Sequence, residues 1–249
     1  MRLLVSVLAV FLPIGGLAVL HLAVYSVSRR AALRLNRWIS TVFARRIFSV
    51  MATYLGFRFE GNRQSLSMLP ERYLVIANHQ SLLDIPLFMR YLDGSRLRFV
   101  AKEELARFVP LVSRILKTDR HCVIPRKGSP SRAMRIMDDF AVEVVKRGWI
   151  PVLFPEGTRS RDGSLGTFHA AGFRRFLDTS PMPVAVCAIE GGWKMGSLEG
   201  IARGTKGGSY RVEVLRVFPA PSGKAEQMRI LEEGKALIQQ KIVEWRGAR

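Results

Sequence analysis

Short apolar runs alternate with helical stretches from Gly56 to the end of the chain. The runs are rich in Val, Ile and Leu, as expected for strands buried on both faces. They predict strands at residues 73–77, 97–101, 122–125, 150–154, 184–189 and 210–218. The spacing of apolar positions between them predicts helices at 83–92, 103–117, 130–147, 168–177 and 225–246. This alternation predicts an α/β fold with a central, mostly parallel or mixed sheet flanked by helices.

The first apolar run differs from the others in length. Residues 3–27 carry no charge, and about 20 apolar residues can span a bilayer. The run is too long for the apolar part of a cleaved signal peptide, which has about 7–15 residues. Pro13 and the pair Gly15-Gly16 lie within it, so a bent or half-inserted helix is an open alternative to a straight span.

Residues 29–55 are predicted to form a second helix with a basic stripe. The stripe consists of Arg30, Arg34, Arg37 and Arg45, opposite an apolar face. This pattern predicts a helix in the membrane interface, with its arginines toward anionic lipid headgroups. The alternative is a helix packed on the globular part with a solvated basic face.

The chain is therefore divided into an N-terminal membrane-anchoring segment, residues 1–55, and a globular domain, residues 56–249. The arginines that follow the apolar run place its C-terminal side in the cytoplasm. We expect the protein at the cytoplasmic face of the inner (plasma) membrane.

Charge supports an anionic partner. The sequence has 39 Lys and Arg against 20 Asp and Glu, a formal net charge of +19. Nucleic acid would also fit this charge, but the apolar N-terminus and the lack of an aromatic-basic RNA motif favour a membrane with anionic lipids. Cys122 and Cys187 lie in predicted strands, where small buried side chains are expected.

Two polar segments follow predicted strands and carry the candidate chemistry. The first includes His79, with Asp84 five residues further on. A carboxylate bonded to one imidazole nitrogen fixes the tautomer and leaves the other nitrogen as a base for a hydroxyl. The alternative is a histidine in a helix-capping loop, with the aspartate on the surface. No third ligand has suitable spacing, so no metal site is predicted.

The second segment is Glu156-Gly157-Thr158-Arg159. Glycine lets the backbone approach a ligand, and an arginine offers two parallel N–H donors to a phosphate. Alternatively, the segment is a strand-exit turn with a structural ion pair. A base with its carboxylate, next to a loop of this kind, can deprotonate an alcohol beside a phosphate.

Together these segments resemble the glycerolipid acyltransferase family, which includes 1-acyl-sn-glycerol-3-phosphate acyltransferases. Residues 78–84 match its NHxSxxD block, and residues 154–160 match its FPEGTRS block. The resemblance implies that His79 is the base and that Asp84 orients it. It also implies that the substrates are a lysophospholipid and an acyl thioester, either acyl-CoA or acyl-carrier protein, with no cofactor. The residues assigned to substrate binding are Asn78, Ser81, Arg126, Glu156, Gly157, Thr158 and Arg159.

Other parts of the family pattern are present with departures. The G-x-I-x-x-D-R strand appears at residues 120–126 without its Gly and Asp, although Arg126 is kept. Where relatives carry Phe-Lys-x-Gly after the second block, residues 168–172 lack the Lys. In the family these positions flank the acceptor pocket, so the identity of the acceptor stays open.

We therefore expect an O-acyltransferase that converts 1-acyl-sn-glycerol-3-phosphate into phosphatidic acid. A second hypothesis keeps the chemistry and changes the acceptor to lyso-ornithine lipid or lysophosphatidylglycerol. A third is a non-catalytic basic membrane-binding module. The presence of His79, Asp84 and Glu156 argues against the third hypothesis, because a binding module needs none of them.

Overall fold

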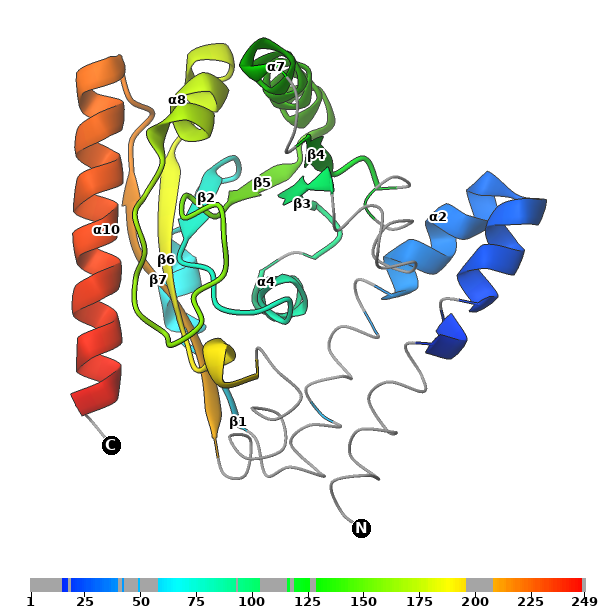
Figure 1. Ribbon diagram of the computed structural model, residues 1–249, viewed down its shortest axis with the longest axis horizontal. Helices are drawn as coiled ribbons and strands as arrows, with labels where there is room; N and C mark the ends of the chain where they lie inside the picture. The colour runs from blue at the N-terminus through cyan, green and yellow to red at the C-terminus, as the bar shows by residue number, and fades with distance from the viewer. Residues whose placement is uncertain are drawn as a thin grey trace.

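The computed structural model describes residues 15–17, 19–39, 42, 49, 58–92, 94–103, 116, 119–125, 129–195 and 208–247. Within these residues a single seven-stranded sheet has helices on both faces (Figure 1). The predicted α/β class with a central mixed sheet is thus confirmed. The strands are β1 (Arg58–Gly61), β2 (Leu74–Ala77), β3 (Leu97–Lys102), β4 (Cys122–Ile124), β5 (Ile150–Leu153), β6 (Val184–Glu190) and β7 (Ser209–Phe218).

The strand order is β1-β7-β6-β2-β5-β3-β4. All neighbouring pairs are parallel except β6 and β7, which are antiparallel. Strand β2 lies between β6 and β5, with Val75 opposite both Ala185 and Val152. The segments that follow β2 and β5 therefore leave the sheet side by side, at the carboxyl edge where ligands commonly bind in α/β sheets.

All six predicted strands are present, each within one residue of its predicted ends. Strand β1 was not predicted, because its sequence Arg58-Phe59-Glu60-Gly61 has no apolar run. It is an edge strand paired only with β7 in the described part of the sheet. Charged side chains are common on such strands because they discourage pairing with other chains.

Five α-helices have defined bounds among the described residues, and the last four of them match the prediction closely. They are α2 (Arg29–Trp38), α4 (Asp84–Tyr91), α7 (Pro130–Arg147), α8 (Ala170–Thr179) and α10 (Lys224–Gly247). Helix α7 has its predicted bounds: the Ser129 side chain accepts a bond from the Ser131 N–H at its start, and Gly148 ends it at φ 63°. Most of the helix predicted at 103–117 lies outside the described residues.

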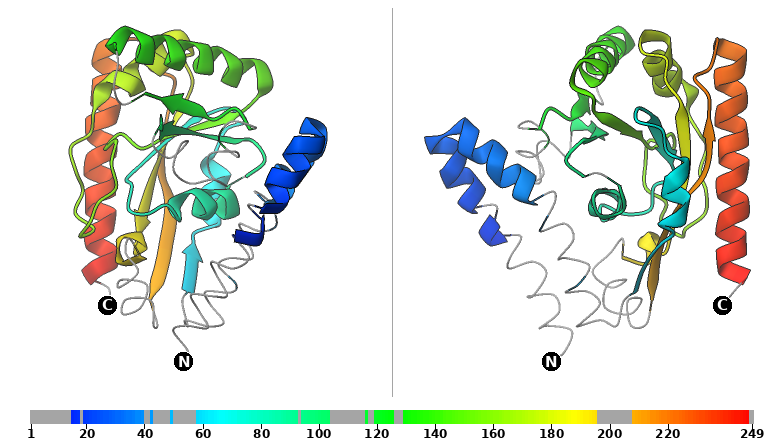
Figure 2. Two further views of the ribbon diagram at one scale, coloured as in Figure 1. Left: turned by 45° about the vertical axis from the view of Figure 1, so that its right-hand side comes forward. Right: turned by 180° about the vertical axis from the view of Figure 1, so that it is seen from behind.

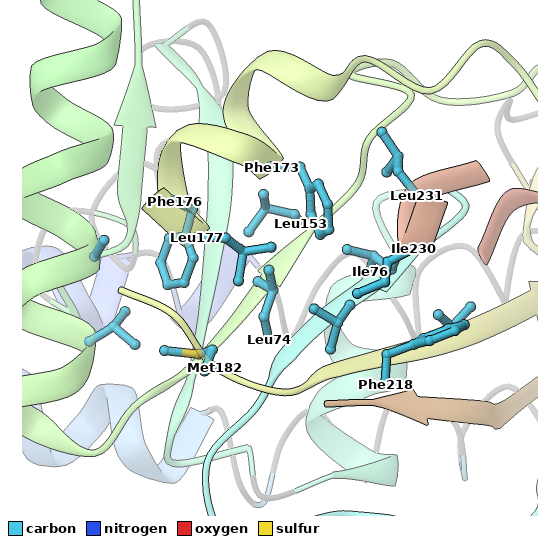
Figure 3. Packing of buried hydrophobic residues seen from close by; sticks show 14 of the residues in the cluster. Leu74, Ile76, Leu153, Phe173, Phe176, Leu177, Met182, Phe218, Ile230 and Leu231 are labelled. Carbon is cyan, nitrogen blue, oxygen red and sulfur yellow. The ribbon is translucent and has the colours of Figure 1, made fainter. Parts of the chain in front are cut away.

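Each face of the sheet has its own apolar core. In β2, Leu74 and Ile76 point to the face covered by α7, α8 and α10 (Figure 3). Val75 and Ala77 point to the opposite face, where α4 packs. The period of two along a strand explains this division. Burial on both faces explains why β2 has no exposed residue.

The N-terminal helices lie on the α4 side of the sheet, far from α10 (Figure 2). Residues 15–17 and 19–27 are helical, and Ser28 then caps α2 by accepting a bond from the Ala31 N–H at 3.3 Å. Among the described residues, no helix is both long enough and apolar enough to cross a bilayer. Residues 3–14, and most of residues 40–57, lie outside the described part, so the anchoring segment stays a prediction.

Candidate active site

His79 lies in the turn between β2 and α4, and its ring is bonded to the first residue of that helix. The Nδ1 atom of His79 is 2.6 Å from Oδ2 of Asp84. The same oxygen accepts bonds from the N–H groups of Gln80, at 2.7 Å, and Ser81, at 3.1 Å. Three donors around one oxygen stabilise the ionised carboxylate, so Nδ1 of His79 is assigned as the protonated nitrogen.

The other imidazole nitrogen is left open. Within the described part of the chain, Nε2 of His79 makes no hydrogen bond, and 14% of the side chain is exposed. The Phe154 ring stacks on the imidazole with a centroid distance of 4.1 Å and an interplanar angle of 11°. The carboxylate and the aromatic ring together hold the imidazole in one orientation, which suits a general base.

Tyr210 completes the set of donors around the aspartate, and sequence reasoning missed this role. Its hydroxyl donates to Oδ1 of Asp84, and the side chain is fully buried. Burial is the main reason that the pKa of Tyr210 is raised well above its usual value. Gly192 makes room for the phenol, since a Cβ there would overlap the Tyr210 hydroxyl. In the sequence, Tyr210 looks like any aromatic residue of a strand.

The buried Glu156 side chain connects the two polar segments through hydrogen bonds. Its Oε1 accepts the N–H of His79 at 2.8 Å, and its Oε2 accepts the N–H of Gly166, also at 2.8 Å. Ser160 N–H in turn donates to the His79 carbonyl at 2.8 Å. Burial raises the pKa of the Glu156 carboxyl, while these backbone bonds act against the rise. Glu156 thus fixes the backbone on which the candidate base is mounted.

The other predicted binding residues fall into two groups. Asn78 and Ser81 are buried, at 2% exposure each. The Asn78 amide exchanges two bonds with the backbone of Ile189, at 2.9 and 2.8 Å. By contrast, Gly157, Thr158 and Arg159 are all exposed, with Gly157 at φ 62°.

Arg126 lies outside the described residues, so its position relative to this loop is not described. Three residues of the predicted set therefore face outward beside His79, and their role in substrate binding stays a prediction.

A second hydrogen-bond network connects helix α10 to the first polar segment. Gln80 Nε2 donates to Glu190 Oε2 at 3.0 Å, and Gly192 N–H donates to Gln80 Oε1 at 3.0 Å. Arg246, near the end of α10, donates to both oxygens of Glu190, at 3.0 and 3.1 Å. The ion pair keeps the pKa of Glu190 below its usual value despite burial.

Metal and thiol chemistry have little support among the described residues. They contain no group of three or more His, Cys, Asp or Glu side chains that could hold a metal ion. Cys122 and Cys187 are free and buried, as the sequence predicted. Burial raises the pKa of Cys122 to about 12, which leaves it a protonated, unreactive thiol at neutral pH.

Comparison with known proteins agrees with this geometry. A family model described as Acyltransferase matches residues 58–190. A 1-acyl-sn-glycerol-3-phosphate acyltransferase from Cocos nucifera is 32% identical over 130 residues, covering 51% of this chain and 41% of the relative. The human 1-acyl-sn-glycerol-3-phosphate acyltransferase beta is 32% identical over 120 residues, covering 48% of this chain and 42% of the relative. The chain thus spans about two fifths of the length of these curated relatives.

A solved structure resembles the whole chain. It is the 1-acyl-sn-glycerophosphate (LPA) acyltransferase PlsC from Thermotoga maritima, with a TM-score of 0.65 and 24% sequence identity. The match covers 99% of this chain and 98% of that one. At this identity the similarity supports the fold.

Proposed function

Because this chain belongs to the acyltransferase family, we propose that it transfers an acyl chain from a thioester to the sn-2 hydroxyl of 1-acyl-sn-glycerol-3-phosphate, forming phosphatidic acid. The observation that carries the proposal is the His79–Asp84 pair at 2.6 Å, with the second imidazole nitrogen open beside an exposed arginine loop. The relatives named for this reaction add support.

The proposed reaction needs one proton relay. Nε2 of His79 takes the proton of the acceptor hydroxyl while its oxygen attacks the thioester carbonyl. Asp84 stabilises the resulting imidazolium without becoming protonated. A carbon–oxygen bond forms, and nearby backbone amides stabilise the oxyanion of the tetrahedral intermediate. The carbon–sulfur bond then breaks, and the imidazolium returns its proton to the leaving thiolate.

In this scheme the exposed loop positions the acceptor. Arg159, helped by Arg126, holds the phosphate so that the hydroxyl lies near His79. Fixing the two reacting groups in this way lowers the entropic part of the barrier. The donor is acyl-CoA or acyl-carrier protein, and the reaction needs no metal or cofactor.

Membrane association is also part of the proposal. We infer that residues 1–55 attach the enzyme to the cytoplasmic face of the inner membrane, near anionic lipids. Among the described residues, the helix at 19–27 exposes Val19 by 69%, Leu20 by 49% and Val27 by 89%. Arg30 and Arg34 are exposed on the next helix. Exposed apolar and basic side chains on adjacent helices favour an interfacial position.

A panel assay tests the proposed acceptor. Membranes containing the protein would receive a radiolabelled acyl thioester together with lysophosphatidic acid, lysophosphatidylglycerol or lyso-ornithine lipid, and the products would be separated by chromatography. We expect labelled phosphatidic acid as the main product. If another lysolipid is preferred, that lysolipid replaces lysophosphatidic acid as the acceptor. The missing Lys in residues 168–172 motivates this alternative. No transfer to any acceptor would contradict acyltransferase activity.

A further inference from the structure

A cavity of about 600 Å³ lies between the N-terminal helices and the sheet. Four arginines line it: Arg29 from α2, Arg98 from β3, Arg120 from the turn before β4, and Arg147 from the end of α7. Among its described lining residues, Asp119 is the only acid. Four guanidinium groups from four separate elements converge on one space, which is a pattern suited to an anion.

This cavity is separate from the candidate active site. Its lining residues Leu97 and Trp149 lie at the amino ends of β3 and β5. His79 and Phe154 follow the carboxyl ends of β2 and β5. The four residues of β5 separate the two places by about 13 Å along the strand.

The cavity lies at the amino edge of the sheet, and both faces contribute to its wall. Met89 and Leu97 belong to the apolar core on the α4 face. Trp149 packs against the core on the opposite face, where Arg147 ends α7.

The described lining residues of the cavity carry more positive than negative charge. The four arginines outnumber the one acid, Asp119, which accepts a bond from Asn36 at 3.3 Å. Outside the lining, Glu143 pairs with Arg147 at 2.5 Å and with Arg120 at 3.5 Å.

Trp149 supports two of the arginines. The guanidinium of Arg98 lies 4.3 Å from the centroid of its ring, and that of Arg147 lies 5.3 Å away. These cation–π contacts hold both guanidinium groups at the cavity wall.

An apolar surface begins next to this charge. Tyr25 lines the cavity from the helix at 19–27, whose residues Val19, Leu20, Leu22 and Val27 are 69%, 49%, 45% and 89% exposed. A ligand with an anionic head and an apolar body matches this arrangement, whereas a fully polar anion would leave the helix surface unused.

We propose that this cavity binds the phosphate group of an anionic membrane phospholipid. The bound lipid is a second one, distinct from the acceptor, with its chains lying along the helix at residues 19–27. It holds the N-terminal helices at the bilayer surface. The inference adds to the proposed function and does not depend on which lysolipid is acylated.

Calorimetric titration of the full chain in neutral detergent tests this site. The probe is dihexanoyl phosphatidylglycerol below its micelle concentration, with no acyl donor present. The cavity variant carries Arg29→Gln and Arg120→Asn; asparagine suits position 120, where φ is 56°. The control carries Arg132→Gln and Arg135→Gln, which remove the same charge from exposed positions of α7 outside the cavity lining. Melting curves check that both variants fold.

We expect saturable binding that weakens about tenfold or more in the cavity variant, because charge-assisted bonds are lost. In the control variant it should change by less than about twofold, since only long-range charge is removed. Equal weakening in both variants would show general electrostatic attraction and overturn the proposal. No saturable lipid binding would also overturn it.

Inorganic phosphate and adenosine 3′,5′-bisphosphate form the remaining arms of the titration. If the bisphosphate binds in a cavity-dependent way and the lipid does not, the site belongs to a nucleotide phosphate instead. Because the titration contains no acyl donor, its failure is distinguishable from failure of the proposed acyl transfer.

Discussion

Two histidines beside strand ends show how different surroundings give one side chain different roles. His79 follows the carboxyl end of β2, with Nδ1 bonded to Asp84 and its other nitrogen open. His121 precedes the amino end of β4 and is 8% exposed. Its Nδ1 accepts the N–H of Phe99 at 2.9 Å. Burial, with a smaller contribution from Arg98, lowers the pKa of His121 to about 3.

The comparison shows that the partner of Nδ1 decides which role a histidine side chain can have. A carboxylate on Nδ1 stabilises the imidazolium, so His79 can accept a proton during a reaction. A backbone N–H on Nδ1 requires the neutral ring, so His121 serves as a fixed acceptor that joins β3 to the turn before β4. The first arrangement suits a general base, and the second joins two parts of the fold.

The largest effect should come from His79→Ala. Loss of the base should reduce acyl transfer by about 10²–10⁴-fold, while vesicle binding persists. Initial rates with labelled acyl thioester would measure this. His121→Gln is the matched control and should keep turnover within about threefold at neutral pH, because the His121 ring bonds to the Phe99 backbone and not to the His79–Asp84 pair. Turnover of the His79 variant within tenfold of wild type would rule out the base assignment.

Tyr210→Phe should have the next largest effect. Without the phenol, Oδ1 of Asp84 loses a donor, and we expect kcat to fall roughly tenfold to a hundredfold with little change in KM. With one donor fewer, Asp84 is held less firmly and orients the imidazole less well. Initial rates at saturating acceptor would measure the fall in kcat.

Tyr91→Phe offers a control for the loss of a buried hydroxyl. Its hydroxyl donates to the Asn62 carbonyl at 2.7 Å, and burial raises its pKa to about 12. This variant should lose stability without a comparable fall in kcat. A Tyr210 variant whose kcat falls no more than that of the Tyr91 variant would reduce Tyr210 to a packing residue.

The buried histidine makes a separate prediction about stability. A depressed folded-state pKa contributes stability that is present above pH 6.5 and is lost as pH falls toward 3. The free energy of unfolding of wild type relative to His121→Gln should fall by about 1.4 kcal/mol per pH unit in that window. Urea unfolding at about pH 7.5 and about pH 5.5 would measure the difference. Equal pH dependence of the two proteins would mean that His121 is protonated when folded.

The smallest effect is expected from Arg159→Lys. Lysine keeps the charge but cannot form two parallel bonds to a phosphate. The KM for a phosphate-bearing acceptor should rise about fivefold, from the loss of about 1 kcal/mol, while the KM for the acyl donor stays the same. A change in the donor KM alone would assign the loop to the thioester instead.

Local pattern was sufficient for most of the fold and for the proximity of His79 and Asp84. Strand and helix periodicities are set by neighbouring residues, and five residues separate His79 from Asp84. One turn of chain can therefore bring them together without help from the rest of the molecule. The sequence also indicated the loop after β5, because Gly157 and Arg159 are typical of a ligand-binding loop.

The support for that pair depends on tertiary structure. Tyr210 is 126 residues from Asp84, and Glu156 is 77 residues from His79. Their contacts exist because β2 lies between β5 and β6, and β7 pairs with β6. A buried tyrosine and a buried glutamate have no local pattern that reveals which distant polar group each will meet. Strand order and burial decide that, and they also bring four arginines from four elements to one cavity.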